Sequence, residues 1–150
     1  MYHRIVEGRI RRLFARLNAG DVGFVAAQFA EPAEHVMVGD HALGGTRRTM
    51  GSIRAWYERL HRIFPDISFE LHAVLVSGWP WRTTIAVVWT DRFTFVDGSP
   101  GTNRGVHVIG LRWGRARSLT VHCDTARLRA YLERLGAAGI GDALAAPIVD

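Results

Sequence analysis

Two side chains that can move protons, Asp91 and His107, interrupt stretches of the chain that otherwise alternate between apolar and polar residues. In an extended strand alternate side chains share one face, so Asp91 falls in line with Trp89 and Phe93, and His107 with Ile109. A buried ionisable group is costly unless it is paired or hydrogen-bonded. A carboxyl and an imidazole can meet that need by bonding each other. They can also act as general acid and base, because burial and mutual charge shift their pKa values.

The Asp91–His107 pair admits two interpretations. It is either a structural hydrogen bond, with Asp91 placed where its strand bends toward the rim, or an acid–base pair on the wall of a pocket. If the two strands are neighbours, we expect the side chains to approach within about 2.6–3.2 Å, or across one bridging water. The sequence alone leaves both interpretations open.

A third candidate for acid–base chemistry is Asp40. It follows a short predicted strand and precedes Gly44-Gly45, so it is either a turn residue or a base at the mouth of a pocket. Contact with an apolar substrate is expected from aromatic and aliphatic residues on the predicted inner faces. These candidates are Trp56, Tyr57, Trp89, Phe93, Ile109 and Val121.

No pattern in the chain indicates a metal or a cofactor. The 7 histidines show no metal-ligand spacing, and Cys123 has no second cysteine beside it. Gly98, Gly101 and Gly105 do not join a strand to a helix, so they read as turn residues and not as a phosphate-binding loop. We therefore expect a protein that works without a metal or cofactor.

The hydrophobic periodicity predicts helices first and strands afterwards. Apolar residues at helical spacing predict a helix over 4–17, a short helix capped by Asp21, and a helix from Ser52 to about residue 64. A short strand over 35–39 lies between the last two. The two-residue period from Ile67 to Asp124 predicts four strands, and a final helix follows. The four strands cover roughly 67–77, 82–95, 104–113 and 116–123, with turns at 78–81, 97–101 and 114. This order is typical of an α+β domain.

Length and composition bound the classes of protein. The 150 residues suit one domain over 1–150, and 48% hydrophobic residues suit a packed core. The net charge of +5 comes from 19 scattered basic residues, all arginine, so we expect no nucleic-acid partner. No apolar run approaches the roughly 20 residues that span a bilayer, so we expect no membrane partner. One cysteine excludes an internal disulfide and favours the reducing cytoplasm.

Several segments of the chain resemble ketosteroid isomerase and the SnoaL-like polyketide cyclases. In the front half the resemblance lies in Leu17–Asp21, Phe29-Ala30, Val36–Asp40 and Ile53–Tyr57. In the back half it lies in Gly105–His107, Arg112–Arg115 and Asp124–Leu128. The resemblance covers roughly residues 5–135 and is to the NTF2-like superfamily. It implies a cone in which a curved antiparallel sheet wraps around N-terminal helices and one apolar pocket.

The resemblance also implies roles for particular residues. It places a base at Asp40, at the end of the first strand, and a pocket residue at His107. Limonene epoxide hydrolase, which has an aspartate near the position of Asp91, is similar to the chain in this respect. The chain departs from the family patterns at Leu13, where ketosteroid isomerase has its oxyanion tyrosine, and at Val121, where the cyclases have an aspartate.

These features predict a pocket protein for a small apolar molecule resembling a secondary metabolite. We expect a cofactor-free acid–base enzyme of the isomerase, cyclase, hydratase or dehydratase type. The alternative is a non-catalytic ligand-binding or accessory protein of the same fold. We also expect a homodimer formed through the outer face of the sheet. That face is predicted to carry His72, Val74, Thr84, Val88 and Thr90.

Overall fold

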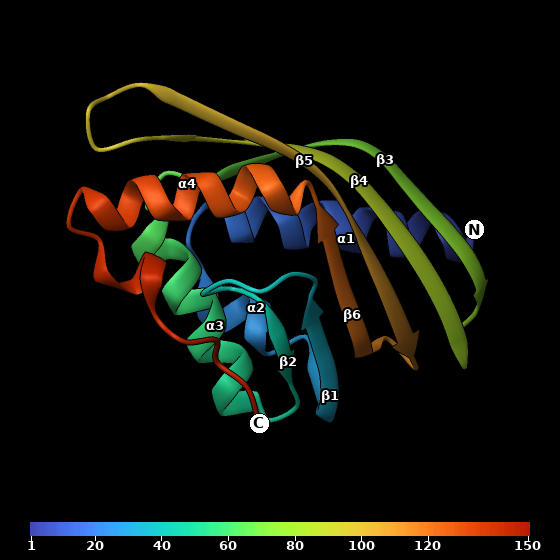
Figure 1. Cartoon of the computed structure of the whole chain (residues 1–150). Helices are drawn as coiled ribbons and strands as arrows, with labels where there is room; N and C mark the ends of the chain where they lie inside the picture. The colour runs from blue at the N-terminus through green and yellow to red at the C-terminus, as the bar shows by residue number, and fades with distance from the viewer.

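The computed structural model describes residues 1–150, and its helices follow the apolar stripes of the sequence (Figure 1). The helices are α1 (Tyr2–Asn18), α2 (Val22–Ala26), α3 (Met50–Ile63), α4 (Thr125–Ala137) and a 3₁₀ helix, η1 (Gly141–Leu144). Asp21 caps α2 by accepting from the Phe24 N–H at 3.1 Å, and Asp124 caps α4 by accepting from the Arg127 N–H at 3.0 Å. None of these helices is long and apolar enough to cross a membrane.

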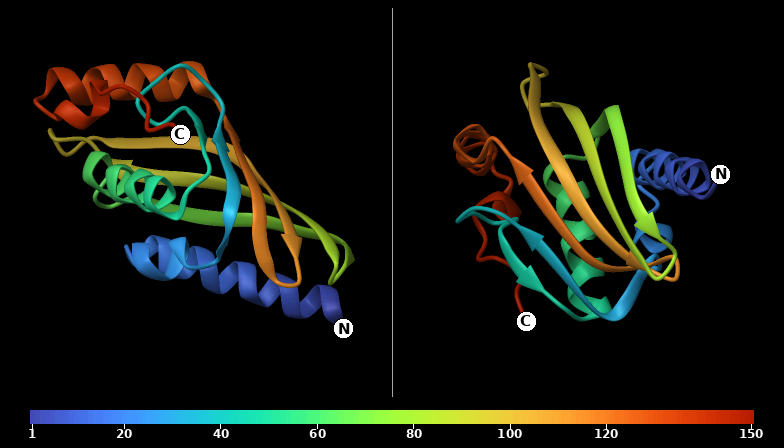
Figure 2. Two further views of the ribbon diagram at one scale, coloured as in Figure 1. Left: turned by 90° about the horizontal axis from the view of Figure 1, so that it is seen from below. Right: turned by 90° about the vertical axis from the view of Figure 1, so that its right-hand side faces the viewer.

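Six strands form one curved, open sheet in the order β2-β1-β6-β5-β4-β3. Their bounds are β1 (Phe29–Met37), β2 (Gly45–Arg47), β3 (Ser68–Trp79), β4 (Arg82–Thr94), β5 (Pro100–Arg112) and β6 (Arg115–Cys123). The β1–β6 pair is parallel and the other pairs are antiparallel, so the sheet is mixed. Helices α1 and α3 lie on the inner side of the curve (Figure 2). The α+β cone expected from the sequence is therefore confirmed.

The predicted inner faces of the long strands are buried, as a two-residue period requires. Along β4 every second residue from Ile85 to Phe95 is buried, including Asp91. His107, Ile109 and Leu111 are buried on β5. Together with the stripes of α1, α3 and α4, these side chains form one continuous core.

Three predictions for the segment from residue 29 to residue 52 were wrong. Strand β1 begins at Phe29, six residues before the predicted start. Pro32 lies inside this strand and does not separate it from the preceding helix. The expected loop over 40–49 contains a short edge strand, β2. The cap of α3 is Thr49, whose hydroxyl accepts from the Ser52 N–H at 3.2 Å, and not Ser52 itself.

An irregularity in β3 changes the outer face of the sheet. The register with β4 shifts between Leu71 and Ala73, so Val74 pairs with the buried Val87. Val74 therefore packs toward the core, and the prediction that it lies on the outer face was wrong. Leu75 takes the outward position and is 62% exposed. A strict alternation cannot reveal such an extra residue.

Candidate functional site

The site lies inside the cone, in an apolar cavity of about 40 Å³ between the sheet, α1, α3 and α4. Asp91, Asn103 and His107 line it from the sheet, and Tyr57 of α3 and Tyr131 of α4 line it from the helices. The apolar lining comprises Leu17, Met37, Leu43, Trp56, Leu60, Phe64, Ile67, Phe69, Trp89, Phe93, Val121, Cys123 and Leu128. This volume holds about three water molecules, so a larger molecule must displace them and move side chains.

The ring of His107 is held in one neutral tautomer. The Trp89 indole N–H donates to His107 Nδ1 at 2.7 Å. Indole nitrogen is a donor only, so Nδ1 must be the acceptor and the ring proton resides on Nε2. Burial lowers the pKa of His107 to about 3, so the ring stays uncharged at neutral pH. The rings of Phe14 and Phe69 hold it edge-on, with centroids 5.1 and 6.2 Å away. His107 Nε2–H has no partner in the chain and is free to donate to a molecule in the cavity.

Asp91 is a buried carboxyl that is only partly satisfied. Its Oδ1 accepts from the Asn103 backbone N–H at 2.7 Å, and no arginine or histidine pairs with it. Burial raises the pKa of Asp91 to about 6, against the opposing effect of the Asn103 N–H. A carboxyl with such a pKa can exchange protons near neutral pH, which an ordinary surface aspartate cannot do.

The predicted contact between Asp91 and His107 is absent. In the β4–β5 ladder Asp91 pairs with Asn103, and His107 pairs with Val87. The strands are neighbours and the two side chains share a face, but four residues separate them along the strand, roughly 13 Å. The reason is the turn. A turn over 97–101 would pair Asp91 with His107, whereas the actual ladder is symmetric about Asp97 and starts β5 at Pro100.

The other predicted site residues divide into three groups. Trp56, Tyr57, Trp89, Phe93 and Val121 line the inner cavity with Asp91 and His107. Ile109 lines a different hollow, described below. Asp40 is exposed in the loop after β1 and does not line the cavity, so its proposed place at a pocket mouth is not supported.

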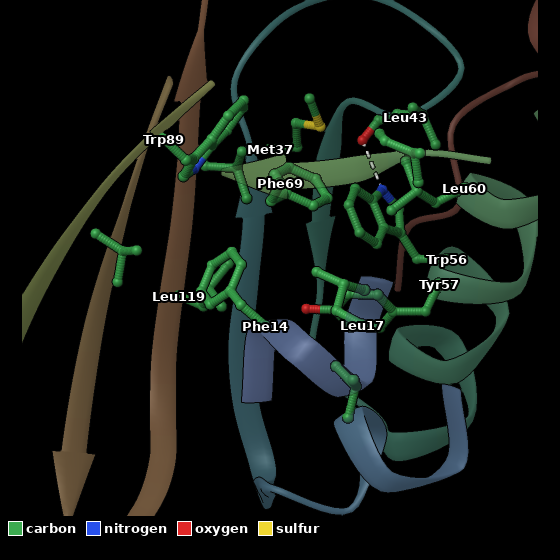
Figure 3. Close-up of a cluster of buried hydrophobic side chains, with 14 of the residues drawn as sticks. Phe14, Leu17, Met37, Leu43, Trp56, Tyr57, Leu60, Phe69, Trp89 and Leu119 are labelled. Atoms are coloured by element: carbon green, nitrogen blue, oxygen red, sulfur yellow. Dashed lines mark hydrogen bonds between the residues drawn. The ribbon is translucent and has the colours of Figure 1, made fainter. Parts of the chain in front are cut away.

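Trp56 is fixed in the cavity wall by a hydrogen bond. Its indole N–H donates to the Leu43 carbonyl at 2.7 Å, which ties α3 to the loop before β2 (Figure 3). Figure 3 also shows Trp89, Phe69 and Met37 converging from the sheet on the same interior. Aromatic rings therefore form a large part of the wall, which can orient a flat or cyclic molecule by shape.

Sequence reasoning missed Asn103. Its Nδ2 donates to the Asp124 carbonyl at 3.1 Å, and its backbone N–H holds Asp91. The sequence could have identified it, because Asn103, His107 and Ile109 are separated by even numbers of residues and so share one face of a strand. The prediction started the strand at residue 104 and so left Asn103 just outside it.

A second buried polar group, also missed, lies behind the cavity where β1 meets β2. His35 and Arg47 face each other across the ladder and are both fully buried. His35 Nε2 lies 3.3 Å from the Tyr57 hydroxyl, and the Arg47 guanidinium lies over the Trp56 ring at 5.4 Å. Burial and then the Arg47 charge keep the pKa of His35 well below its usual value. Arg47 Nε and Nη1 and His35 Nδ1 have no partner in the chain.

Neither a metal nor thiol chemistry is indicated by the side chains present. No group of three or more His, Cys, Asp or Glu residues gathers in space to bind a metal ion. Burial raises the pKa of Cys123 to about 11, so its thiol is not ionised at neutral pH and is a poor nucleophile.

A larger hollow, the outer cleft, opens between α1, α2 and the ends of β5 and β6. Its volume is about 250 Å³. Its apolar lining comprises Val6, Ile10, Leu13, Phe24, Val25, Phe29, Tyr57, Ile109, Leu111, Ala116 and Leu119. Arg9, Arg12 and Gln28 supply its polar side chains. Tyr57 belongs to both hollows, so it stands between them.

Comparison with solved structures finds the same fold. An NTF2-like protein of unknown function from Burkholderia pseudomallei is 25% identical, with a TM-score of 0.71 over 81% of this chain and 92% of that one. TerC, co-crystallised with polyporic acid, is 20% identical, with a TM-score of 0.67 over 85% of this chain and 95% of TerC. The epoxide hydrolase/cyclase-like enzyme SalBIII is 18% identical, with a TM-score of 0.67 over 81% and 92%.

Comparison of the sequence agrees with that of the fold. None of the curated proteins matches. The family model of the SnoaL-like domain matches residues 10–119, which span α1 to β6 and include Asp91 and His107. The chain therefore belongs to the SnoaL-like domain family and has the NTF2-like fold.

Proposed function

We propose that the protein is a cofactor-free acid–base enzyme that acts on a small, mostly apolar carbonyl compound in the inner cavity. One observation carries the proposal. A carboxyl with its pKa raised to about 6 and an uncharged imidazole N–H lie on one wall of an otherwise apolar cavity. Burial of two such groups without a mutual bond weakens the fold, and a catalytic role accounts for that arrangement.

The two groups suit different halves of one proton transfer. Asp91 as carboxylate removes a proton from the carbon beside the carbonyl, and the C–H electron pair moves through the new C=C bond onto the oxygen. His107 Nε2–H donates a hydrogen bond to that oxygen and stays neutral, because its pKa is lowered to about 3 by burial. Protonated Asp91 then returns the proton to another carbon, which isomerises the substrate. Attack of the enolate carbon on a second carbonyl carbon of the same molecule would instead close a ring: the C=O electron pair moves onto that oxygen, which takes the proton from Asp91.

The absence of a direct Asp91–His107 bond supports this division of roles. Four residues of strand, roughly 13 Å, separate the base and the donor, so a substrate that contacts both must move side chains between them. SalBIII is described as acting in pyran ring formation, and ring closure, here through carbon, is one of the reactions that we propose. We also propose that the protein is cytoplasmic and acts as a homodimer, without a nucleic-acid partner.

A non-catalytic ligand-binding role is the second candidate. The Asn103 N–H that holds Asp91 Oδ1 favours it, because this bond gives the carboxyl a structural partner in the ladder. A binder would need the apolar cavity but not the ionisable groups on its wall. The two candidates therefore predict different effects of removing the Asp91 charge: an enzyme would lose its activity, and a binder would keep its ligand.

Proton exchange tests the proposal without knowledge of the product. Cyclic ketones and 1,3-diketones are incubated with the protein in D₂O, and deuterium uptake beside the carbonyl is followed by NMR. We expect the native protein to accelerate uptake and Asp91→Asn to lower the rate about 10²- to 10⁴-fold. Asp97→Asn, in the exposed turn of the same hairpin, is the matched control and should behave as native. Acceleration that survives Asp91→Asn would contradict the assignment of the base.

A further inference from the structure

The outer cleft continues the inner cavity along the same strand faces. On β5 the residue after His107 on the inner face is Ile109, and on β6 Leu119 precedes Val121. His107 and Val121 line the inner cavity, whereas Ile109 and Leu119 line the outer cleft. The two hollows are therefore consecutive parts of one interior.

Phe14 and Tyr57 divide this interior. On α1, Leu13 lines the outer cleft and Leu17 lines the inner cavity, with the buried Phe14 between them. Figure 3 shows the Phe14 ring beside Leu119 and the Tyr57 hydroxyl turned toward it. The Phe14 ring also contacts His107 edge-on at 5.1 Å. A molecule in the outer cleft is thus one aromatic layer away from the His107 donor.

The charge at the rim of the outer cleft is of one sign. Arg9 and Arg12 lie one turn apart on α1, and no acidic side chain lines the cleft. Arg9 donates to the Gly114 carbonyl at 2.9 Å, which is an uncharged acceptor. The neighbouring arginines of the helix, Arg11 and Arg16, are paired with Glu7 and Asp21, but Arg12 has no ion-pair partner. The rim therefore presents an uncompensated positive charge over an apolar hollow.

We propose that the outer cleft binds the body of an amphipathic small molecule whose carboxylate is held by Arg12 and Arg9. The apolar lining takes the hydrocarbon part, and a guanidinium suits a carboxylate because both are planar and can share two hydrogen bonds. The proposal rests on the proposed function, since it names the substrate class of that enzyme as acidic and amphipathic. Its test measures binding and does not depend on turnover.

Three ligands of equal chain length separate charge from apolar contact. Decanoate, decanol and decylamine are titrated below their aggregation limits by isothermal calorimetry. We expect decanoate to bind about fivefold more tightly than decanol, and decylamine to bind most weakly. Equal affinity for all three would overturn the proposal, because the rim charge would then have no part in recognition.

Two variants of α1 test the residue assignment. Arg12→Gln keeps the helix propensity and removes the charge at the rim, and we expect it to weaken decanoate about fivefold and decanol not at all. Arg11→Gln is the matched control, because Arg11 points to the other flank of the helix, where it pairs with Glu7 at 2.8 Å. An equal effect of the two variants on decanoate would overturn the assignment.

A third variant tests whether the ligand lies in the cleft. Ala116 is buried in the cleft wall, and Ala116→Leu reduces the hollow without a change of charge. We expect weaker binding of decanoate and decanol alike. Unchanged binding of both would place the ligand elsewhere and overturn the proposal. Normal decanoate binding with no proton exchange by any carbonyl compound would instead contradict the proposed reaction and leave the binding site standing.

Discussion

Replacement of Asp91 by Asn should make the protein more stable at pH 8 while it removes the proposed base. Asn has the shape of the carboxyl, and its amide oxygen can still accept from the Asn103 N–H. The buried negative charge, in contrast, is removed. Burial raises the pKa of Asp91 from 3.8 to about 6, so the folded state favours the protonated form.

The sign and size of the effect follow from this shift. A group whose pKa is raised on folding contributes stability that is complete below its unfolded pKa and is lost as the pH rises through its folded pKa. For Asp91 the loss therefore falls between about pH 4 and pH 6.5. A shift of roughly two units at 1.36 kcal/mol per unit corresponds to about 3 kcal/mol at pH 8. The side chain is only 8% exposed, so solvent screening reduces this figure little.

Urea unfolding at pH 8 and pH 4 measures the effect. We expect Asp91→Asn to exceed the native free energy of unfolding by up to about 3 kcal/mol at pH 8 and to match it at pH 4. Asp97→Asn makes the same change in net charge but should destabilise, because hydrogen bonds from Ser99 hold the pKa of Asp97 down to about 2. A variant at Asp91 that is less stable than the native protein at pH 8 would refute the reasoning and assign the carboxylate a structural role.

Three further outcomes are expected. His107→Phe should lower the free energy of unfolding by about 1–3 kcal/mol at pH 7, because the Trp89 N–H loses its acceptor. It should also remove an acid sensitivity of the native protein, since the depressed pKa of His107 implies stability that is lost as the pH falls from about 6.5 toward 3. Gly105→Ala should destabilise by about 1–3 kcal/mol and change the tryptophan emission, because a Cβ there would lie 2.4 Å from the Trp89 indole. Light scattering at tens of micromolar should give twice the mass of one chain, and Leu75→Glu on the outer face should shift it to the monomer; a native monomer would contradict the proposed dimer.

Much of the fold could be predicted because its signals are local. The apolar stripe of α1, the caps Asp21 and Asp124, and the two-residue period of β4 each depend on neighbouring residues only. The period also identified Asp91 and His107 as buried polar residues, and both line one cavity.

The register of the strands could not be predicted in the same way. Alternation assigns a face to a residue but does not say which residue lies opposite. The pairing depends on where the turn lies. The Phe95 N–H donates to the Ser99 carbonyl at 2.8 Å, so the β4–β5 pairing begins closer to Asp97 than the glycines of 97–101 suggest. Asn103 and the bulge before Ala73, which the sequence did not reveal, both concern pairing between strands. The place of Asp40 could not be predicted either, because it lies in a loop, where no periodicity assigns a face to a side chain.

The buried guanidinium of Arg47 has a consequence for the electrostatic potential of the whole interior. Burial lowers its pKa only to about 10, so it remains charged at every physiological pH. No carboxylate forms a hydrogen bond or an ion pair with it, and its field acts through a medium of low dielectric constant. The potential behind Trp56 and Tyr57 is therefore positive and does not vary with pH in the neutral range. The enolate of the proposed reaction would be stabilised by this field without contact with Arg47, and a cation in the same place would be destabilised.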